Sequence, residues 1–316
     1  MNCKKTVKNI IITLTAVTTT THLINKVISY YSNNNYKSNS NTSRYKWRFG
    51  EIHYTKRGSG TPILLIHSLD PCCSDYEWHS IVDNLALTNT VYTLDLIGCG
   101  KSDKPNMTYT NFLYVQLLSD FIKDVIQEKT DIIVSSTATP IVIMTTQYDK
   151  DAINRIIISS PVDITTCSIA PTQLKKCCKT LINIPIYGTL AYNIILSKKA
   201  IYNRFVEQYY SDIYEIEDNT INEFYLNSHY QNSKGKYLYS SIIANYTNIN
   251  IINTLSNINN SIYIICGNDT PNYLTISENY KKYNSSIEIF TIPGAQLSHL
   301  EYPTKYLEQI KIILDI

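Results

Sequence analysis

Residues 58–69 read GSGTPILLIHSL and residues 91–102 read VYTLDLIGCGKS, and these two stretches decide the fold class. Each contains an apolar run that is followed at once by a polar residue, His67 in the first and Asp95 in the second. A continuous apolar run of this kind is typical of a strand that is buried on both faces of a sheet. The sequence therefore predicts two central strands, each with a polar side chain at its carboxyl end.

Helical patterns alternate with strand patterns along the rest of the chain. Apolar residues spaced i, i+3, i+4, i+7 predict amphipathic helices over 78–85 and 113–126, and residues 52–55 alternate like an edge strand. Alternation of this type builds a mainly parallel sheet with helices on both faces, so the predicted fold class is α/β. Further buried strands are expected at 132–134, 156–158 and 262–265.

The composition indicates a folded chain without a nucleic-acid partner. The chain has 316 residues and 44% hydrophobic content, which is enough to bury a large core. Its 28 Lys and Arg nearly balance its 26 Asp and Glu, so the net charge of +2 gives no basic footprint for nucleic acid. The eight Cys lack the spacing of a disulfide framework or a zinc site. We expect no metal and no cofactor.

The N-terminal segment, residues 1–31, differs from the rest. Residues 9–25 carry no charge and follow three lysines, and this run is near the lower limit of about 17 residues that spans a bilayer. We expect a retained anchor and hence a membrane-associated protein, with a cleaved signal peptide or a soluble amphipathic helix as alternatives. The polar residues 32–46 predict a linker, and residues 47–316 the folded domain.

The two opening stretches resemble those of the α/β-hydrolase superfamily, in particular its bacterial members. In that family one strand ends in His-Gly or a variant, here His67-Ser68, and the next ends in D-x-x-G-x-G-x-S, here beginning at Asp95. We expect the two glycines of this motif in a tight turn with positive φ, which is cheap only for glycine. The match continues to the E-x-P at Glu301, so the resemblance covers about residues 47–316.

The same resemblance implies a helical cap over the pocket, inserted at about 162–256. Helices are expected there over 172–184, 190–205 and 213–230, and many tyrosines fall in this region. An aromatic cap suggests a small apolar ligand, although cap helices that simply pack on one another would look the same.

In this family the nucleophile stands on a sharp strand-to-helix elbow, G-x-S-x-G, which here must lie in residues 134–140, VSSTATP. With Ser136 at the elbow, a bulky residue fills the crowded position two before it, and Pro140 falls inside the helix. Thr137 is a second register. With Ala138 at the elbow, Pro140 falls in the tolerated first turn. The resemblance favours Ala138, which has no attacking oxygen, and Ser136 and Thr137 are the candidate replacements.

The positions where the family has its general base and its acid also differ from the family pattern. Aligning the final motif places Gln296 where the family has its triad histidine, and an amide neither accepts nor returns a proton at neutral pH. His299, three residues later, is the candidate replacement. Asp269 is the candidate acid, with Asp163 as the alternative.

The oxyanion donors are expected to be the backbone N–H groups of Ser68 and Leu69, which survive side-chain change. Three functions stay open. A degenerate Ser-Asp-His triad gives weak or absent hydrolysis of a small apolar ester or amide, by a serine-hydrolase type of chemistry. A non-catalytic member binds a small molecule or a protein on the same fold. A lyase or dehalogenase-like reaction needs a carboxylate at the elbow, where the sequence has none.

Overall fold

The computed structural model describes residues 2–36, 42–269 and 271–316. In these residues eight strands form one sheet in the order β1-β2-β4-β3-β5-β6-β7-β8. The β1–β2 and β2–β4 pairs are antiparallel and the other pairs are parallel, so the mainly parallel sheet expected from the sequence is confirmed. The strands are Ser43–Trp47, Gly50–Arg57, Thr61–Ile66, Asn89–Leu94, Thr130–Ser135, Ile153–Ser159, Ser261–Gly267 and Glu288–Ile292, β1 to β8.

Both faces of the sheet are covered, which explains the continuous apolar runs. Leu64 packs into a core with α3, α4, α11 and α12, whereas its neighbour Leu65 points the other way and packs with η1, α2 and α14. The helices of these two layers are η1 Asp75–Trp78, α2 Val82–Leu85, α3 Asn111–Phe121 with η2 Ile122–Ile126, α4 Thr139–Tyr148, α11 Ile252–Asn257, α12 Pro271–Tyr283, α13 Ser298–Glu301 and α14 Pro303–Leu314.

The turn after β4 requires glycine, as expected. Gly98 and Gly100 have φ of 92° and 43°. A Cβ atom on Gly100 would lie 2.3 Å from a carboxylate oxygen of Asp95, so any side chain there would collide with the end of the strand.

A second group of helices follows β6 and forms the cap. Its apolar residues make a separate cluster in which aromatic rings pack on one another; Phe205 and Phe224, for example, have ring centroids 5.0 Å apart. The cluster also contains Cys72 and Cys73 after β3 and Leu297 and Leu300 after β8, so the aromatic side chains of the cap pack on one another and against the rest of the domain. The helices between β6 and β7 are α5 Ile164–Cys167, α6 Gln173–Asn183, α7 Tyr187–Ile195, α8 Lys198–Arg204, η4 Phe205–Tyr209, η5 Ile213–Glu215, α9 Asp218–Ser233, α10 Lys236–Ile243 and, at their end, α11.

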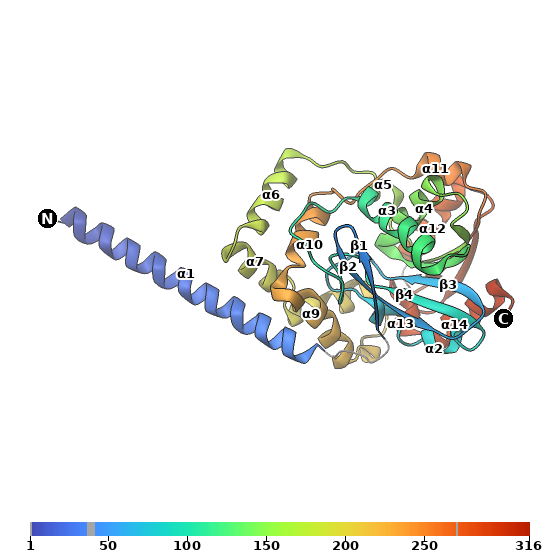
Figure 1. The fold of residues 1–316 in the computed structure, drawn as a ribbon, viewed down its shortest axis with the longest axis horizontal. Coiled ribbons are helices and arrows are strands. Elements are labelled where there is room, and N and C mark those ends of the chain that lie inside the picture. The colour runs from blue at the N-terminus through green and yellow to red at the C-terminus, as the bar shows by residue number, and fades with distance from the viewer. Residues whose placement is uncertain (1, 37–41, 270) are drawn as a thin grey trace.

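Helix α1, Asn2–Asn35, projects from the body of the molecule (Figure 1). Its C-terminal half packs against α7 and α9, and residues 5–17 are exposed on all sides. In the described part of the chain, no helix combines the length and the hydropathy that crossing a bilayer requires. The spanning anchor expected over residues 1–31 is therefore not supported, because threonines and asparagines dilute its apolar run.

The linker expected over residues 32–46 is shorter than the sequence suggested. Helix α1 continues to Asn35, and β1 already begins at Ser43. Residues 37–41, in the middle of the expected linker, lie outside the described residues.

Candidate functional site

The strand-to-helix elbow of this protein lies at Ser136. Strand β5 ends at Ser135, and Ser136 then adopts a φ of 36°, in the left-handed region that residues other than glycine rarely enter. The short 3-10 turn η3, Ser136–Ala138, leads from there into α4. Ser136 is thus held at the carboxyl end of a central parallel strand, the edge at which such sheets bind ligands.

The positions of Ala138 and Pro140 differ from the register that the sequence favoured. Turn η3 stands between the elbow and α4, so Pro140 lies in the first turn of α4 even though Ser136 is at the elbow. Proline is tolerated there because the first N–H groups of a helix have no acceptor within the helix. Ala138 is buried and has an ordinary right-handed helical backbone. The proline therefore does not argue against Ser136.

Thr137, the remaining candidate nucleophile, points away from any base. Its side chain is exposed, and its hydroxyl donates a hydrogen bond to the carbonyl oxygen of Leu69 over 3.3 Å. Among the described residues this hydroxyl bonds no imidazole and no carboxylate. Its exposure does show that solvent reaches the residue next to Ser136.

Gln296 lies directly beside Ser136. Its Nε2 donates a hydrogen bond to Ser136 Oγ over 2.7 Å, and its Oε1 accepts one from the hydroxyl of Tyr273 over 3.0 Å. Burial raises the pKa of Tyr273 to about 12, so the phenol keeps its proton at neutral pH. Three residues that follow β5, β7 and β8 therefore form a chain of uncharged hydrogen bonds that ends on the elbow hydroxyl.

The two candidate acids are engaged elsewhere. Asp269 is exposed, and its carboxylate lies 2.8 Å from Ser211 Oγ and accepts a hydrogen bond from the N–H of Gly294 over 2.7 Å. Asp163 is the N-cap of α5 and accepts from the N–H of Thr166. Hydrogen bonds hold the pKa of Asp163 below its usual value even though burial opposes this. The structure brings neither acid into the chain of Ser136, Gln296 and Tyr273.

His299 belongs to a different, fully buried network. Its Nδ1 lies 2.9 Å from Ser159 Oγ, its Nε2 lies 3.2 Å from Glu77 Oε1, and its ring stacks on Trp78 with centroids 4.5 Å apart. Because both ring nitrogens are used in this way, the imidazole is not available to Ser136.

Glu77 connects that network to the end of β5. It accepts hydrogen bonds from the N–H of Ser68 over 3.0 Å and from Ser68 Oγ over 3.2 Å, and Ser68 Oγ lies 2.8 Å from Ser135 Oγ. Burial opposes ionisation of Glu77, but the hydrogen bond and charge of His299 outweigh it and hold the pKa of Glu77 below its ordinary value. A buried carboxylate thus supports the residue that precedes the elbow.

The expected oxyanion donors differ from each other in availability. The Ser68 N–H is taken by Glu77, so it is not free to bind a developing negative charge. The Leu69 N–H has no partner among the described residues, and Leu69 is joined to Thr137 through the bond already described. Of the two expected donors, only the Leu69 N–H therefore has no hydrogen-bond partner within the described residues.

Two residues of this region were missed by sequence reasoning. Tyr273 and Glu77 belong to no motif, and in a chain with 27 tyrosines a single Tyr carries no signal. The only available hint for Tyr273 is its position shortly after β7, where the acid of a triad would be sought.

The cap is tied to the loop that carries Gln296. The N–H of Leu297 donates to the carbonyl of Tyr209 over 3.0 Å. Glu301 accepts hydrogen bonds from the N–H groups of Ser211 and Asp212, each over 2.8 Å, and from that of Ala295 over 3.0 Å. One buried carboxylate therefore holds the cap and the site loop together.

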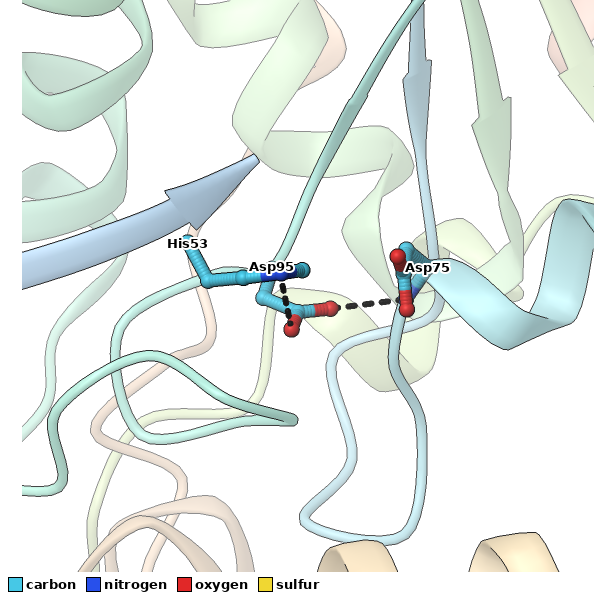
Figure 2. A group of neighbouring side chains, drawn as sticks. All are labelled: His53, Asp75 and Asp95. Atoms are coloured by element: carbon cyan, nitrogen blue, oxygen red, sulfur yellow. Dashed lines mark hydrogen bonds and ion pairs between the residues drawn. The ribbon is translucent and has the colours of Figure 1, made fainter. Parts of the chain in front are cut away.

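A separate cluster contains the side chains best placed for a cation. In the described part of the chain, His53, Asp75 and Asp95 form the one such group, with possible ligand atoms within 4.8 Å of one another. Figure 2 shows His53 and Asp75 approaching Asp95 from opposite sides. Asp95 already accepts hydrogen bonds from the N–H groups of Asp75 and Lys101, each over 2.7 Å, and lies 3.0 Å from His53 Nδ1.

The charges of this cluster compensate one another without a metal. Burial opposes ionisation of Asp95, but the hydrogen bond and charge of His53 outweigh it and hold its pKa well below the usual range. Burial, and then the charge of Asp95, raise the pKa of Asp75 to about 6. The lone pairs that a cation would need are largely used within the protein, so the cluster fits an internal ion pair better than a metal site.

The chemistry available at the elbow follows from these contacts. An amide in contact with Ser136 orients the hydroxyl but does not remove its proton, whichever way the amide is turned. A free N–H beside it is suited to an oxyanion or a carbonyl oxygen. Among the described residues, the only side chain that hydrogen-bonds Ser136 Oγ is therefore an amide and not a general base.

Comparisons with known proteins agree with the fold. A family model described as "alpha/beta hydrolase fold" matches residues 61–176. A 2-hydroxy-6-oxo-6-(2'-aminophenyl)hexa-2,4-dienoic acid hydrolase from Metapseudomonas resinovorans is 35% identical over 74 residues, 23% of this chain and 26% of that protein. A haloalkane dehalogenase from Agrobacterium fabrum is 40% identical over 60 residues, 19% of each chain. The matches span about a quarter or less of these relatives' length.

Solved structures match over nearly the whole chain. A serine hydrolase involved in carbazole degradation superposes with a TM-score of 0.69 at 17% identity, over 87% of this chain and 98% of that chain. A bromoperoxidase from Bacillus anthracis also gives 0.69, at 15% identity, over 87% of this chain and all of the other. At these identities the likeness shows the fold.

Proposed function

This chain belongs to the α/β-hydrolase superfamily, and from that premise we propose that it is a member with a degenerate triad, which binds a small apolar acyl compound at Ser136 and hydrolyses it slowly at most. One observation carries the proposal. Gln296 Nε2 lies 2.7 Å from Ser136 Oγ, so a side chain that takes up no proton fills the place of the general base.

The first part of the proposal, binding of an acyl compound, rests on two groups of a hydrolase site that this chain keeps. Ser136 keeps a hydroxyl on an elbow with positive φ, and the neighbouring Leu69 N–H has no partner in the described residues. These two groups suit a carbonyl carbon and its oxygen. A carbonyl compound with an ester or amide leaving group is the substrate class that fits them.

The second part of the proposal, slow hydrolysis, rests on how much each group of a triad contributes to the rate. Loss of the histidine from a serine-protease triad costs a factor of roughly 10⁶ in turnover. An oxyanion donor and substrate binding alone leave a factor of about 10³ to 10⁴ over the reaction in water. A site with Ser136 and Gln296 is therefore expected to turn over activated esters only, and slowly.

Non-catalytic binding of a small molecule or a protein is the second candidate. It is favoured by the hydrogen bond from Tyr273 to Gln296, which fixes the amide in place of a base. Covalent labelling at Ser136 separates the two candidates, because binding alone does not require an attacking oxygen. The third, carboxylate-based reaction has no support, since the elbow residue is a serine.

The test compares the wild-type chain with Ser136→Ala, Gln296→His and Gln296→Ala. Each is treated with a fluorophosphonate and, separately, with an activated aryl ester. We expect little labelling of the wild type and clear labelling of Gln296→His at Ser136, with none in Ser136→Ala. The variant Gln296→Ala controls for simple opening of the site. Efficient wild-type turnover that Ser136→Ala abolishes would contradict the proposal, and so would an unlabelled but folded Gln296→His.

A further inference from the structure

Helix α1 turns four small polar side chains toward the body and leaves most of its apolar side chains exposed. The side chains that it turns toward the body are Thr21, Asn25, Ser29 and Ser32, each less than 9% exposed. Asn25 takes part in two hydrogen bonds with the cap, to the carbonyl of Ile186 over 2.8 Å and from Asn193 over 3.0 Å. The helix is therefore fixed to the cap by polar contacts, and burial of its apolar residues does not explain its position.

The apolar residues of α1 face outward. Ile10, Ile11, Leu14, Val17, Leu23 and Val27 are between 49% and 67% exposed. So many exposed large apolar side chains on one helix of a folded protein indicate a binding surface. The neighbouring cap helices continue it, because Leu174 and Leu181 of α6 and Ile194 of α7 are more than 60% exposed. Helix α7 contacts both α6 and the C-terminal half of α1, so it links these two helices.

The charge on these elements has one sign. The sequence contains no Asp or Glu from residue 1 to residue 50 or from residue 164 to residue 206, although the whole chain is close to neutral. The charged residues of α1, α6, α7 and α8 are therefore Lys and Arg alone. Among them Lys26 and Lys176 are exposed and form no ion pair within the described residues.

A hollow at the junction of α1 with the cap gathers further cations. Its volume is about 360 Å³, and the lysines that line it are Lys26, Lys234 and Lys236. The Nζ of Lys236 donates to Thr189 Oγ1 over 2.9 Å and to the carbonyl of Ile184 over 3.3 Å, so it bonds no carboxylate. Burial lowers the pKa of Lys236. An anion in this hollow would meet several positive groups.

We propose that α1, α6 and α7 form a surface that binds an anionic lipid bilayer, with α1 lying in the plane of the interface. The exposed aliphatic side chains enter the boundary between headgroups and acyl chains, and the lysines contact the phosphate-bearing headgroups. This combination fits lipid better than nucleic acid, because exposed Ile and Leu side chains can be buried among acyl chains but gain little from contact with a phosphate backbone. The inference does not depend on the chemistry proposed at Ser136.

The experiment measures co-sedimentation of the full chain with vesicles of phosphatidylcholine alone and of phosphatidylcholine mixed with phosphatidylserine, at low and high ionic strength. We expect binding to the mixed vesicles that weakens at high salt. A charge variant, Lys26→Glu with Lys176→Glu and Lys234→Glu, is expected to bind roughly 10- to 100-fold more weakly. Its control carries Lys150→Glu, Lys281→Glu and Lys282→Glu, at exposed lysines just after α4 and in the last turn of α12, and is expected to bind like the wild type.

An apolar variant tests the other half of the surface. Ile11→Ser with Leu14→Ser is expected to reduce binding at both salt concentrations, whereas Leu87→Ser with Ile312→Ser, at a pair that is more exposed, leaves it unchanged. Circular dichroism checks that each variant is folded.

Three results would overturn the proposal. The first is that the chain binds neither kind of vesicle, which would leave a protein as the occupant of this surface. The second is equal binding to both kinds of vesicle that does not depend on salt. The third is salt-sensitive binding that the apolar variant does not change.

Discussion

Tyr273 and Gln296 are joined by a hydrogen bond of 3.0 Å from the phenol to the amide oxygen. The same amide donates to Ser136, so the hydroxyl at the elbow ends a chain that contains no group able to take up a proton near neutral pH. Because burial raises the pKa of Tyr273 to about 12, the chain keeps its donors throughout the neutral range. Ser136, Gln296 and Tyr273 thus form a hydrogen-bonded chain in which no side chain acts as a base near neutral pH.

The first prediction concerns the pH dependence of a repaired site. In Gln296→His, an imidazole stands between Ser136 and Tyr273, and its ordinary pKa is about 6.5. Hydrolysis of an activated ester by this variant is therefore expected to rise with pH through that value, because only the neutral imidazole acts as a base. The wild type is expected to show no such step. The measurement is the initial rate of ester hydrolysis across the neutral pH range. Gln296→Asn is the control, because it changes the size of the side chain without adding a base. A flat profile for a folded, active Gln296→His would mean that the imidazole does not act on Ser136.

The second prediction tests the position of the elbow. Glycine adopts a φ of 36° without strain, and the left-handed region costs other residues about 1 kcal/mol. Ser136→Gly is therefore expected to be more stable than Ser136→Ala by up to about 1 kcal/mol. Ala138→Gly is expected to lose about 1 kcal/mol, because Ala138 has a helical backbone. Denaturant unfolding of the three variants compares them, and the reverse order would place the elbow at Ala138.

The sequence was sufficient for the sheet and insufficient for the details of the site. The apolar runs at β3 and β5 predicted buried central strands because both of their faces meet helices. The structure places the elbow at Ser136 and not at Ala138, because a 3-10 turn that begins at Ser136 precedes α4 and such a turn has no sequence signature of its own. Tyr273 and Glu77 act through contacts between distant segments, and no spacing along the chain encodes such contacts.

The third prediction uses the raised pKa of Asp75. Its folded-state value of about 6 lies above the ordinary value of 3.8, so the folded protein binds this proton more tightly than the unfolded chain. The contribution of Asp75 to the free energy of unfolding is therefore greatest when the pH is below its ordinary pKa, and it is lost as the pH rises through about 6.

Asp75→Asn removes that loss. We expect it to raise the free energy of unfolding by roughly 1–3 kcal/mol at neutral pH, and by progressively less as the pH falls toward 4. Thermal unfolding at several pH values measures the effect. Asp151→Asn, at an exposed carboxylate, is the matched control. A destabilised Asp75→Asn at neutral pH would show that Asp75 is held as a needed charge, as a metal ligand would be.

The fourth prediction concerns Glu301, which joins the cap to the loop of Gln296. It is buried, and its carboxylate accepts from the N–H groups of Ser211, Asp212 and Ala295. Glu301→Ala leaves these donors without an acceptor and is expected to cost roughly 3–5 kcal/mol. Glu301→Gln keeps one carbonyl oxygen and is expected to cost less.

Because these bonds hold the cap, their loss is expected to expose the segment around Ser211 to protease before the rest of the chain unfolds. Limited proteolysis, read with denaturant unfolding, measures both effects, and Glu308→Ala on the exposed side of α14 is the control. If Glu301→Ala destabilised the whole chain but left cleavage near Ser211 unchanged, the carboxylate would support the core and not the cap. Equal stability of Glu301→Ala and Glu308→Ala would show that these hydrogen bonds contribute little.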